Sequence, residues 1–375
     1  MKKKVRILEV NKAYYPHIGG IESLVMQYSE TFSRNNKSDL RVLVCRDEKG
    51  RTKYENINDV KVIRCGSFGT YFSCPISFSF ISKFRKLSKN ADIIHINTPF
   101  PLADLALLLS GYKGKVVISW HSDVVKQKKL LFFYKPLMMK MLKRADLIVT
   151  ATQGHINGSP YISKFSKKCR VIPYGLDIEK YLSIKKRPIL TEKLNNKSSL
   201  KVFFTGRLVY YKGVNVLINA FKKVRNCELF IAGTGTLENE LKEYAEKNNM
   251  DSIHFLGFLE DNDLKCAFAD CDIFVLPSVA NSEAFGIVQL EAMVYSKPVI
   301  NTSLPTGVPY VSVDGISGIT VEPSNPEKLA DAINMLAGDE NLRHAYGANA
   351  FKRVRDLFNA ENVLEELFDA ITENR

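Results

Sequence analysis

Short runs of β-branched and aromatic residues alternate with longer helical patterns along the whole chain, and this alternation constrains the fold more than any other feature. Strand–helix alternation predicts parallel sheets with helices on both faces. The strands are also almost continuously apolar, as in IIHIN (93–97) and VFFTG (202–206), which is typical of sheets buried on both sides. The sequence therefore predicts an α/β fold of doubly wound parallel sheets.

The expected strands are Val5–Val10, Leu40–Val44, Val60–Ile63, Asp92–Ile96, Lys115–Trp120, Asp146–Thr150, Lys201–Thr205, Glu228–Ala232, Ile253–Phe255, Ile273–Leu276 and Pro298–Asn301. The expected helices are Glu22–Ser33, Ile76–Ser88, Leu102–Ser110, Lys129–Arg144, Val214–Val224, Leu237–Lys247, Ile287–Tyr295, Pro326–Ala337 and a pair within Leu342–Ile371.

The alternation is interrupted between about residues 177 and 201. This stretch is polar, contains Pro188 and has no clear period, which indicates a linker or a peripheral excursion. A chain of 375 residues is long enough for two domains. We therefore expect one domain at 1–180, a second at 181–356 and a final helical segment at 357–375. Because parallel sheets bind ligands at the carboxyl ends of their strands, the cleft between the domains is the expected site.

The net positive charge of the chain comes entirely from its first half. Residues 1–180 contain 32 Lys and Arg against 14 Asp and Glu, whereas the rest contains 21 against 26. This asymmetry indicates that the first domain meets an anionic partner. Segments 67–86 and 126–144 interleave cations with large apolar residues, which suits the surface of an anionic membrane. The alternative is core helices whose lysines reach water. Nucleic acid ranks last, because no known nucleic-acid-binding signature is present.

Other features of the composition indicate the cellular compartment and whether a membrane span, a metal or a cofactor is expected. Seven cysteines without a C-x-x-C pair indicate a reduced, cytosolic protein. The basic N-terminus continues into a strand pattern and not into a signal peptide. The longest apolar stretch, near Leu102–Leu109, is too short to span a membrane. Since no histidine or acidic cluster has ligand spacing, we expect neither a metal nor a cofactor.

The densest motif follows the expected strand Ile273–Leu276. Ser282 can cap the next helix, leaving N–H groups at 284–286 to attract a phosphate. Glu283 and Glu291 can accept hydrogen bonds from vicinal hydroxyls of a sugar or a ribose. The alternative is that Glu283 only completes a helix start and Glu291 pairs with a distant cation.

A second motif, TGRLVYYKGV (205–214), follows the strand Lys201–Thr205. Arg207 and Lys212 can neutralise a diphosphate leaving group there. The alternative is a pair of solvated loop cations. The next strand end carries Gly233 and Gly235 but lacks the third glycine of a dinucleotide-binding motif. These two glycines could therefore equally well serve only to form a turn.

Two features of the first half of the chain also follow expected strands. Gly19 and Gly20 permit a ligand to approach the backbone closely at the head of a helix, although paired glycines often form only a turn. His121 ends the strand Lys115–Trp120, with Asp123 close behind. A neutral histidine there can bind a sugar hydroxyl or hold a backbone carbonyl.

Together these motifs resemble glycosyltransferase family 4, which has the GT-B architecture of two Rossmann-like domains facing across a cleft. The resemblance covers nearly the whole chain. EAFGIVQLE (283–291) matches the paired-glutamate motif, Arg207 and Lys212 stand at the donor-phosphate position, and the stretch 19–21 is similar to the glycine loop. The segments 120–127 and 301–309 resemble the subgroup that transfers mannose or related sugars from GDP donors in bacterial surface polysaccharide synthesis.

The resemblance implies retention of anomeric configuration without a metal. Glu283, His121, Arg207 and Lys212 would form the catalytic set. The residues expected to bind the donor are Gly19, Gly20, Arg207, Lys212, Gly257, Phe258, Leu259, Glu283, Phe285, Gly286, Ile287 and Glu291. Within this set Glu291 would hold the ribose, Glu283 the sugar, and the loop 257–259 the base. The segment from about 357 would cross back to the first domain.

We therefore expect a hexosyltransferase that uses a nucleotide-diphosphate sugar, with a GDP-mannose-type donor favoured. The acceptor would be a lipid-linked saccharide of O-antigen, capsule or exopolysaccharide synthesis, at the cytoplasmic face of the cell membrane. The alternatives are a nucleotide-sugar epimerase of the same architecture and a non-catalytic binder of sugar nucleotides or polyanions.

Overall fold

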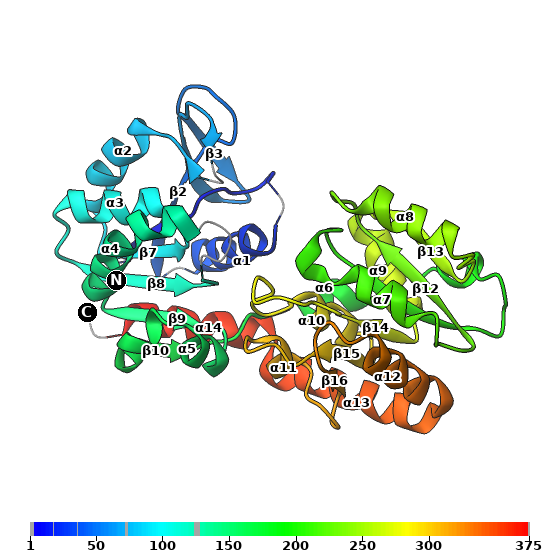
Figure 1. Cartoon of the computed structure of the whole chain (residues 1–375). Coiled ribbons are helices and arrows are strands. Elements are labelled where there is room, and N and C mark those ends of the chain that lie inside the picture. Colours follow the sequence, from blue (N-terminus) through cyan, green and yellow to red (C-terminus); the bar gives the residue numbers. More distant parts are fainter. Residues whose placement is uncertain (1–3, 18, 36, 72–73, 124–127, 374–375) are drawn as a thin grey trace. The chain divides into compact units, whose positions relative to one another are not determined.

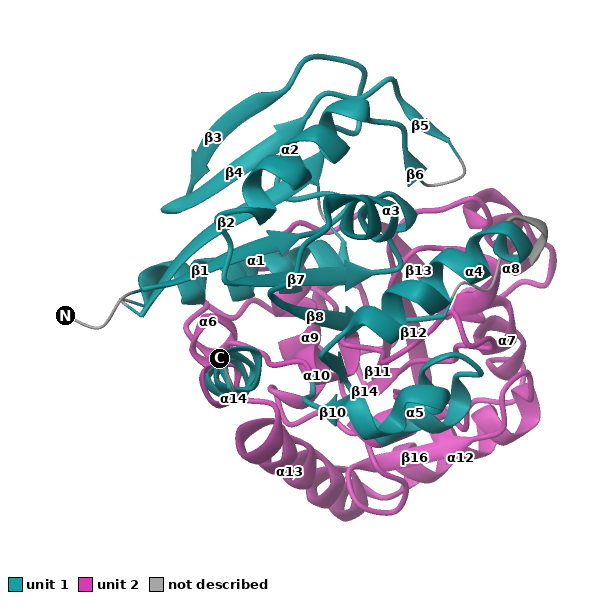
Figure 2. Cartoon of the chain, turned by 90° about the vertical axis from the view of Figure 1, so that its left-hand side faces the viewer, with its two compact units in different colours: residues 1–173, 363–375 teal, residues 174–362 magenta. Residues whose placement is uncertain are grey.

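The chain forms two compact units, each with its own sheet and core (Figures 1 and 2). The computed structural model describes residues 4–17, 19–35, 37–71, 74–123 and 128–373. Unit 1 comprises residues 1–173 and 363–375, and unit 2 comprises residues 174–362. The boundary expected after residue 180 falls inside helix α6 (Ile178–Leu182) of unit 2, and the C-terminal residues of unit 1 begin at Val363.

Unit 1 is built on a sheet with the strand order β10-β9-β8-β7-β1-β2-β4-β3, which runs from bottom to top in Figure 1. Its strands are β1 (Val5–Val10), β2 (Ser38–Cys45), β3 (Lys53–Ile57), β4 (Val60–Cys65), β7 (Ile93–Thr98), β8 (Lys115–Trp120), β9 (Leu147–Thr150) and β10 (Cys169–Val171). A separate hairpin pairs β5 (Thr70–Tyr71) with β6 (Cys74–Pro75). Edge strand β3 pairs antiparallel with β4, so the sheet is mixed and not wholly parallel. The polar, largely exposed sequence of β3 hid this strand from a search for buried apolar runs.

The helices of unit 1 are α1 (Gly20–Arg34), α2 (Phe78–Ser88), α3 (Pro101–Ser110), α4 (Lys128–Arg144), α5 (Gln153–Gly158), the 3-10 helix η1 (Ile162–Lys168) and the C-terminal part of α14 (Ala360–Thr372). Helices α2, α3 and α4 cover one sheet face, where Phe80, Phe84 and Phe100 are fully buried. Helix α14 is fastened to unit 1 by an edge-to-face contact between Phe368 and Phe32, with ring centroids 5.1 Å apart. Apolar burial of this kind is the main force that holds an amphipathic helix in place.

Unit 2 has a parallel sheet with the order β13-β12-β11-β14-β15-β16. Its strands are β11 (Leu200–Thr205), β12 (Cys227–Ala232), β13 (Ile253–Gly257), β14 (Ile273–Val275), β15 (Val299–Thr302) and β16 (Gly318–Val321). Its helices are α6, the 3-10 helices η2 (Thr191–Lys193) and η3 (Tyr210–Lys212), α7 (Val214–Ala220), α8 (Glu238–Lys247), α9 (Asp261–Asp270), α10 (Val288–Met293), α11 (Val308–Val311), α12 (Pro326–Gly338), α13 (Glu340–Leu357) and the start of α14. The order reverses between β11 and β14, which is where a doubly wound sheet binds its ligand.

The polar stretch 177–201 is a folded part of unit 2 and not a free linker. The carboxylate of Asp270 accepts hydrogen bonds from the backbone N–H groups of Leu190 and Thr191 at 2.7 and 2.8 Å. Leu190 is itself fully buried. Leu194 is also buried. The segment lacks a clear period because its helices α6 and η2 are very short and side-chain hydrogen bonds and a few apolar residues hold the rest.

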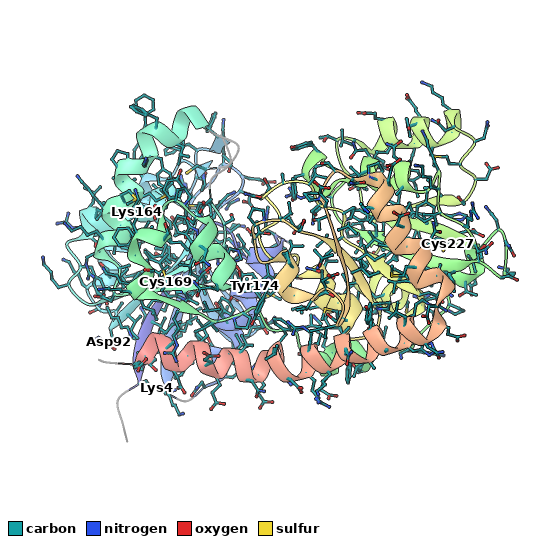
Figure 3. All side chains as sticks on the ribbon, turned by 60° about the horizontal axis from the view of Figure 1, so that its bottom comes forward. Lys4, Asp92, Lys164, Cys169, Tyr174 and Cys227 are labelled. Carbon is teal, nitrogen blue, oxygen red and sulfur yellow. The ribbon has the colours of Figure 1, made fainter. Side chains whose placement is uncertain are left out.

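All seven cysteines are free thiols. Cys169 in β10 and Cys227 in β12, labelled in Figure 3, belong to different units. Burial raises the pKa of the Cys227 thiol to about 12, so it stays protonated and packs as a small apolar side chain. Among the described helices, none combines the length and the apolar character needed to cross a membrane.

Candidate active site

Residues from two neighbouring strand ends meet in unit 2. Lys212 lies in η3 after β11, and Glu283 lies in the loop after β14. The Nζ atom of Lys212 is 2.6 Å from Oε2 of Glu283, and both side chains are almost buried. The Ser278 hydroxyl donates to the same Oε2 at 3.0 Å. The second predicted cation, Arg207, is exposed and donates to the Tyr211 hydroxyl at 3.0 Å.

The position of Lys212 depends on glycine in the backbone that follows it. Gly213 has φ +68°, and a Cβ atom there would lie 2.0 Å from the carbonyl oxygen of Pro277. A side chain at 213 would therefore be strained by its dihedral angle and would collide with the neighbouring strand end. Glycine lets the Lys212 turn approach the Glu283 loop closely enough for the ion pair to form.

The helix after Glu283 begins within one residue of the expected start at Ile287, but Ser282 does not cap it. Helix α10 begins at Val288 with Ile287 at the N-cap and no side-chain cap. Gly286 has φ +71°, in the left-handed region, so a right-handed helix cannot run through it. Upstream, the N–H of Glu283 closes a turn on the carbonyl of Ala280 at 3.0 Å. Residues 283–287 are therefore an irregular loop.

This loop still exposes backbone donors. Within the described part of the chain, no backbone carbonyl accepts from the N–H of Phe285 or Gly286. The Phe285 ring is buried against Tyr174 and Phe358, with centroid distances of 4.7 and 6.1 Å. Aromatic packing thus fixes the loop while its N–H groups remain able to bind an anion.

Glu291 occupies a second, separate environment in α10. The Tyr181 hydroxyl donates to its Oε1 atom at 2.7 Å. Desolvation by the surrounding protein raises the pKa of Glu291 to about 7. The hydrogen bond from Tyr181 and, to a lesser degree, the cations Lys265 and Lys212 oppose this shift only in part. The carboxyl therefore titrates near neutral pH when no ligand is present. Tyr181 was not singled out from the sequence, because it lies in the polar stretch predicted as a linker.

The two glycines after β12, Gly233 and Gly235, serve close packing. A Cβ atom on Gly233 would lie 2.0 Å from the Gly206 carbonyl oxygen, and one on Gly235 would lie 2.3 Å from that of Leu208. Gly257 has φ +66° and accepts from the Gly233 N–H at 2.6 Å. The adjoining Phe258 is 74% exposed. The predicted base-binding loop 257–259 therefore starts beside Gly233, which in turn packs against Gly206, the residue before Arg207.

The predicted residues of unit 1 lie at the carboxyl ends of β8 and at the start of α1. His121 is 4% exposed and its Nε2 atom is 2.8 Å from Oδ1 of Asn97. Burial, together with smaller effects of the nearby His95 and His155, lowers the pKa of His121 to about 3, so the ring is neutral. Gly19 is the N-cap of α1 and Gly20 its first residue. No atom lies within 4 Å of a Cβ built on Gly20, so packing within the protein does not require glycine there.

The site also contains residues that the sequence patterns did not indicate. Ser278, Tyr211 and Tyr181 orient the ionisable groups of unit 2, and Asn97 orients His121. A hydroxyl or an amide in a strand or loop has no local signature. The described residues contain no cluster of three or more His, Cys, Asp or Glu side chains with the arrangement of a metal site.

The arrangement in unit 2 can bind a doubly charged diphosphate and a polyol side by side. Lys212 has three N–H donors, of which Glu283 needs one, and Arg207 adds a planar fork of donors. The Glu283 carboxylate can accept from sugar hydroxyls while it orients the lysine. Such groups are fixed before a ligand arrives, which is the condition for strong electrostatic stabilisation of a leaving group.

Two family models match the chain. Residues 18–180 match Glycosyltransferase Family 4, and residues 186–353 match Glycosyl transferases group 1. O-antigen chain mannosyltransferase C of Escherichia coli is 31% identical over 371 residues, which cover 98% of both chains. The D-rhamnosyltransferase WbpZ of Pseudomonas aeruginosa is 31% identical over 95% of this chain and 93% of its own.

Solved structures agree on the fold. A crystal structure of Anabaena Alr3699/HepE in complex with UDP has a TM-score of 0.80 and 20% identity, and the match covers 98% of this chain and all of that one. Sucrose-phosphate synthase from Thermosynechococcus elongatus has a TM-score of 0.77 with 19% identity over 98% of both chains. The expected GT-B fold of two Rossmann-like domains is confirmed. With 31% identity to curated transferases over nearly its whole length, the chain belongs to the GT-B glycosyltransferases that these two family models describe.

Proposed function

We propose that this glycosyltransferase moves a hexose from a nucleotide-diphosphate sugar to a lipid-linked saccharide, with retention of configuration and without a metal ion. The favoured donor is of the GDP-mannose type, and the product belongs to bacterial O-antigen, capsule or exopolysaccharide synthesis. Two relatives that match almost the whole chain are named as a mannosyltransferase of the O-antigen chain and a D-rhamnosyltransferase, which supports this sugar class.

The observation that carries the proposal is the contact between Lys212 and Glu283 next to Arg207. A departing diphosphate develops negative charge on its bridging oxygen, and two fixed cations stabilise that charge where other transferases use a divalent ion. The N–H groups of Phe285 and Gly286 add further donors for the phosphates. Glu283 and Glu291 accept hydrogen bonds from the hydroxyls of the sugar and the ribose, and Phe258 with Leu259 lies against the base.

Residues of unit 1 also belong to the proposed set of donor-binding residues. Gly20 leaves space at the head of α1 for the donor phosphates, while at Gly19 the Glu22 carboxylate lies 2.3 Å from where a Cβ atom would stand. His121 is neutral and accepts a hydrogen bond from a hydroxyl of the transferred sugar. Among the described residues of the proposed site, no base is paired with a protein nucleophile that a sugar could reach. In the proposed mechanism the leaving phosphate oxygen takes the proton of the acceptor hydroxyl on the same face of the sugar, which retains the configuration.

A ligand screen followed by turnover tests this proposal. The full chain is heated with GDP, UDP or ADP, and the nucleotide of the true donor raises the melting temperature most, because it binds only the folded state. Turnover of GDP-mannose with a lipid-linked saccharide is then measured with and without EDTA, and NMR assigns the anomeric configuration of the product. Inversion, or loss of activity in EDTA that added Mg²⁺ restores, would overturn the mechanism. Stabilisation by UDP alone would mean that the donor is a UDP-sugar and not a GDP-sugar. Conversion of the donor with no acceptor present would favour the epimerase.

We further propose that unit 1 lies on an anionic membrane surface. Phe132 and Phe133 of α4 are 76% and 81% exposed, and Phe78 at the start of α2 is 73% exposed. Lys135 and Lys140 follow on α4, and Lys83 and Arg85 on α2. Exposed aromatic rings beside cations suit the interface of an anionic bilayer. Lys126 of the predicted basic segment lies outside the described residues.

Flotation with lipid vesicles tests the membrane proposal. Vesicles with phosphatidylserine should carry the wild-type protein upward, whereas zwitterionic vesicles should not. The double variant Phe132→Ser, Phe133→Ser should lose most of this binding. A matched control is Met335→Ser in unit 2, which removes a side chain that is 57% exposed. Equal flotation of both variants would contradict the proposed surface.

A further inference from the structure

The two carboxyl oxygens of Glu291 have different surroundings. The Tyr181 hydroxyl donates to Oε1 at 2.7 Å. Among the described residues, no hydrogen bond or ion pair reaches Oε2. Glu291 is also partly exposed, and Oε2 is not one of the buried polar atoms that lack a partner. The protein therefore engages one oxygen of this carboxyl and leaves the other open to a ligand.

Tyr181 is placed by the short helix α6, which is labelled in Figure 1. The helix is capped by Asp177, whose side chain accepts from the Lys180 N–H at 3.1 Å. Ile178 and Tyr181 are three residues apart, so they lie on one side of the helix. They are also the two residues of α6 that are not exposed. The packed side of α6 thus carries the Tyr181 ring into unit 2.

Contacts with two other elements hold Tyr181 in place. The Nζ atom of Lys265 in α9 lies 5.2 Å from the centroid of the Tyr181 ring, and Asp261 accepts from the same Nζ at 2.7 Å. Tyr295, which follows α10, has its ring centroid 6.3 Å from that of Tyr181. The Tyr295 hydroxyl donates to the backbone carbonyl of Tyr181 at 2.5 Å. Ring and backbone are both fixed, and the position of the Tyr181 hydroxyl follows from theirs.

The phenol of Tyr181 stays a donor at every pH at which the protein is folded. Burial and, after it, the negative charge of Glu291 raise the pKa of Tyr181 far above its usual value of 10. The hydroxyl therefore keeps its hydrogen. A donated hydrogen bond favours the ionised form of a carboxyl over the neutral acid. Tyr181 consequently acts on both the orientation and the charge of Glu291.

We propose that Tyr181 is a positioning residue for the nucleotide: it engages Oε1 of Glu291 and leaves Oε2 as the atom that accepts from a ribose hydroxyl. The inference rests on the ribose-binding role of Glu291 in the proposed function, and it adds the accepting atom and the residue behind it. A carboxyl held by one oxygen no longer rotates freely. The ribose therefore meets an acceptor that is already oriented, which lowers the entropic cost of binding.

The groups that face Glu291 keep its carboxyl near the point at which it ionises. Desolvation raises its pKa to about 7, the phenol hydrogen bond opposes this, Asp261 adds to the rise, and Lys265 and Lys212 lower it. Burial raises the pKa of Tyr295, so that neighbour is neutral. Since a ribose hydroxyl donates more strongly to a carboxylate than to an acid, nucleotide binding expels the proton wherever Glu291 still carries one.

Carboxyl ¹³C NMR of the full chain without nucleotide tests the contact itself, with the Glu291 signal assigned by its loss in Glu291→Gln. The wild-type signal should titrate with a midpoint near pH 7. Tyr181→Phe keeps the packed ring and removes only the hydroxyl, so the midpoint should rise by about one pH unit. The matched control is Tyr244→Phe, which removes a hydroxyl that donates to Asn219 at 2.6 Å elsewhere in unit 2. It should leave the midpoint unchanged.

Calorimetry with GDP, or with UDP if the thermal screen selects it, tests the ribose. Buffers of different ionisation enthalpy count the protons released, and Glu291→Gln subtracts those of the phosphates. The wild-type protein should release about half a proton at pH 7 and about a tenth at pH 8, whereas Tyr181→Phe should release about half at pH 8. Tyr181→Phe should bind about fivefold more weakly at pH 7 and approach wild-type affinity at pH 9. In a Glu291→Gln background it should change the affinity less than about twofold.

The results that contradict the inference differ from those that contradict the proposed function. An equal NMR midpoint in Tyr181→Phe and wild type would overturn the positioning role, even if Glu291→Gln binds nucleotide weakly. Wild-type affinity and proton release in Glu291→Gln would remove the ribose from this carboxyl, whatever the NMR titration shows. Should Tyr181→Phe fail to fold, 3-fluorotyrosine in place of Tyr181 decides the question. Its more acidic hydroxyl is a stronger donor and should lower the midpoint, and an unchanged midpoint would overturn the role.

Discussion

Lys212 and Glu283 come from loops after two adjacent strands, and their charged ends meet at 2.6 Å with little exposure to solvent. The cation proposed for the leaving diphosphate is thus held by the carboxylate proposed for the transferred sugar. A ligand that engages either group therefore acts on the other. This coupling makes the pair the most informative place to perturb the enzyme.

Replacing Lys212 by Met should lower kcat by about two to three orders of magnitude, because a fixed donor to the leaving group is lost. Glu283→Gln should lower kcat similarly. The double variant should be far less impaired than the product of the single effects, since both residues act as one unit. Initial rates with saturating donor measure this. Simple multiplication of the two effects would show that the residues act independently.

The control for this series lies at the other end of the same strand. Lys201 is 15% exposed and its Nζ atom is 3.1 Å from the Asp272 carboxylate, so Lys201→Met breaks a comparable ion pair of unit 2. It should reduce the free energy of unfolding to a similar extent as Lys212→Met but leave turnover nearly unchanged. Equal loss of turnover in both variants would mean that general destabilisation explains the effect.

The stability of unit 2 should fall as the pH rises through the range in which Glu291 ionises. Burial raises the pKa of Glu291 from 4.5 to about 7, so the folded state binds its proton more tightly than the unfolded state. The stabilisation is complete below about pH 4.5 and is lost by about pH 7. Glu291→Gln should remove this component from urea denaturation curves recorded by circular dichroism. Identical pH dependence in the two proteins would contradict the shifted pKa.

Nucleotide binding should respond to pH in the opposite direction. Ribose hydroxyls donate to a carboxylate more strongly than to a neutral acid, so the donor favours ionised Glu291. The dissociation constant of the nucleotide should fall as the pH rises from 6 to 8, by up to about tenfold per unit below the pKa. Calorimetry measures this, and Glu291→Gln should bind weakly with no such trend. A constant affinity in the wild-type enzyme would argue against ribose at this carboxylate.

Gly213→Ala should destabilise unit 2 and abolish transfer. The substitution adds a positive-φ strain of about 1–2 kcal/mol and a collision with the Pro277 carbonyl oxygen, which only a shift of the loop can relieve. Gly315→Ala is a matched control, because Gly315 has φ +67° but no atom within 4 Å of the added Cβ. It should lose only the strain energy in thermal unfolding and keep its activity. Equal losses in both variants would mean that the close approach at Gly213 has no importance.

The paired glutamates, the basic pair and the strand ends could be found from the sequence because each belongs to a short local pattern. The buried residues that hydrogen-bond to the site residues could not be found from the sequence in this way. Asn97, beside His121, and Glu9, which accepts from the Asn97 amide, lie within apolar strands, and their significance depends on a register between strands that are far apart in the sequence. One signal was available: the polar residues recur at every second position of β7, which a strand buried on two apolar faces would not show.

The helix start after Glu283 is a case in which the sequence predicted a feature, a capping serine, that the structure does not have. Ser282 precedes an amphipathic run, which is the usual position of an N-cap, and the pattern alone predicted one. The positive φ of Gly286 overrides that preference, since a right-handed helix cannot run through a residue in the left-handed region, and α10 begins only at Val288. Similarly, β3 was missed because an exposed edge strand lacks the apolar run used to find buried strands.

The last prediction concerns Asp104 of α3, which is fully buried. The Tyr134 hydroxyl of α4 donates to its Oδ2 atom, and among the described residues its Oδ1 atom has no partner. Burial raises the pKa of Asp104 from 3.8 to about 7. Folding therefore favours the protonated acid, and this contribution to the stability of unit 1 is present below about pH 3.8 and is lost as the pH rises to about 7.

Asp104→Asn should abolish that loss, because a neutral amide is not charged at high pH and still accepts from Tyr134. At pH 8 the variant should be more stable than the wild-type protein, by an amount on the order of 1–3 kcal/mol. The single tryptophan, Trp120, lies in β8, so its fluorescence reports the unfolding of unit 1 during urea titration. Glu291→Gln in unit 2 should leave this signal unchanged, which separates the two titrating groups. Parallel curves for Asp104→Asn and the wild-type protein from pH 4 to 8 would show that the Asp104 carboxyl is ionised in the folded chain throughout this range.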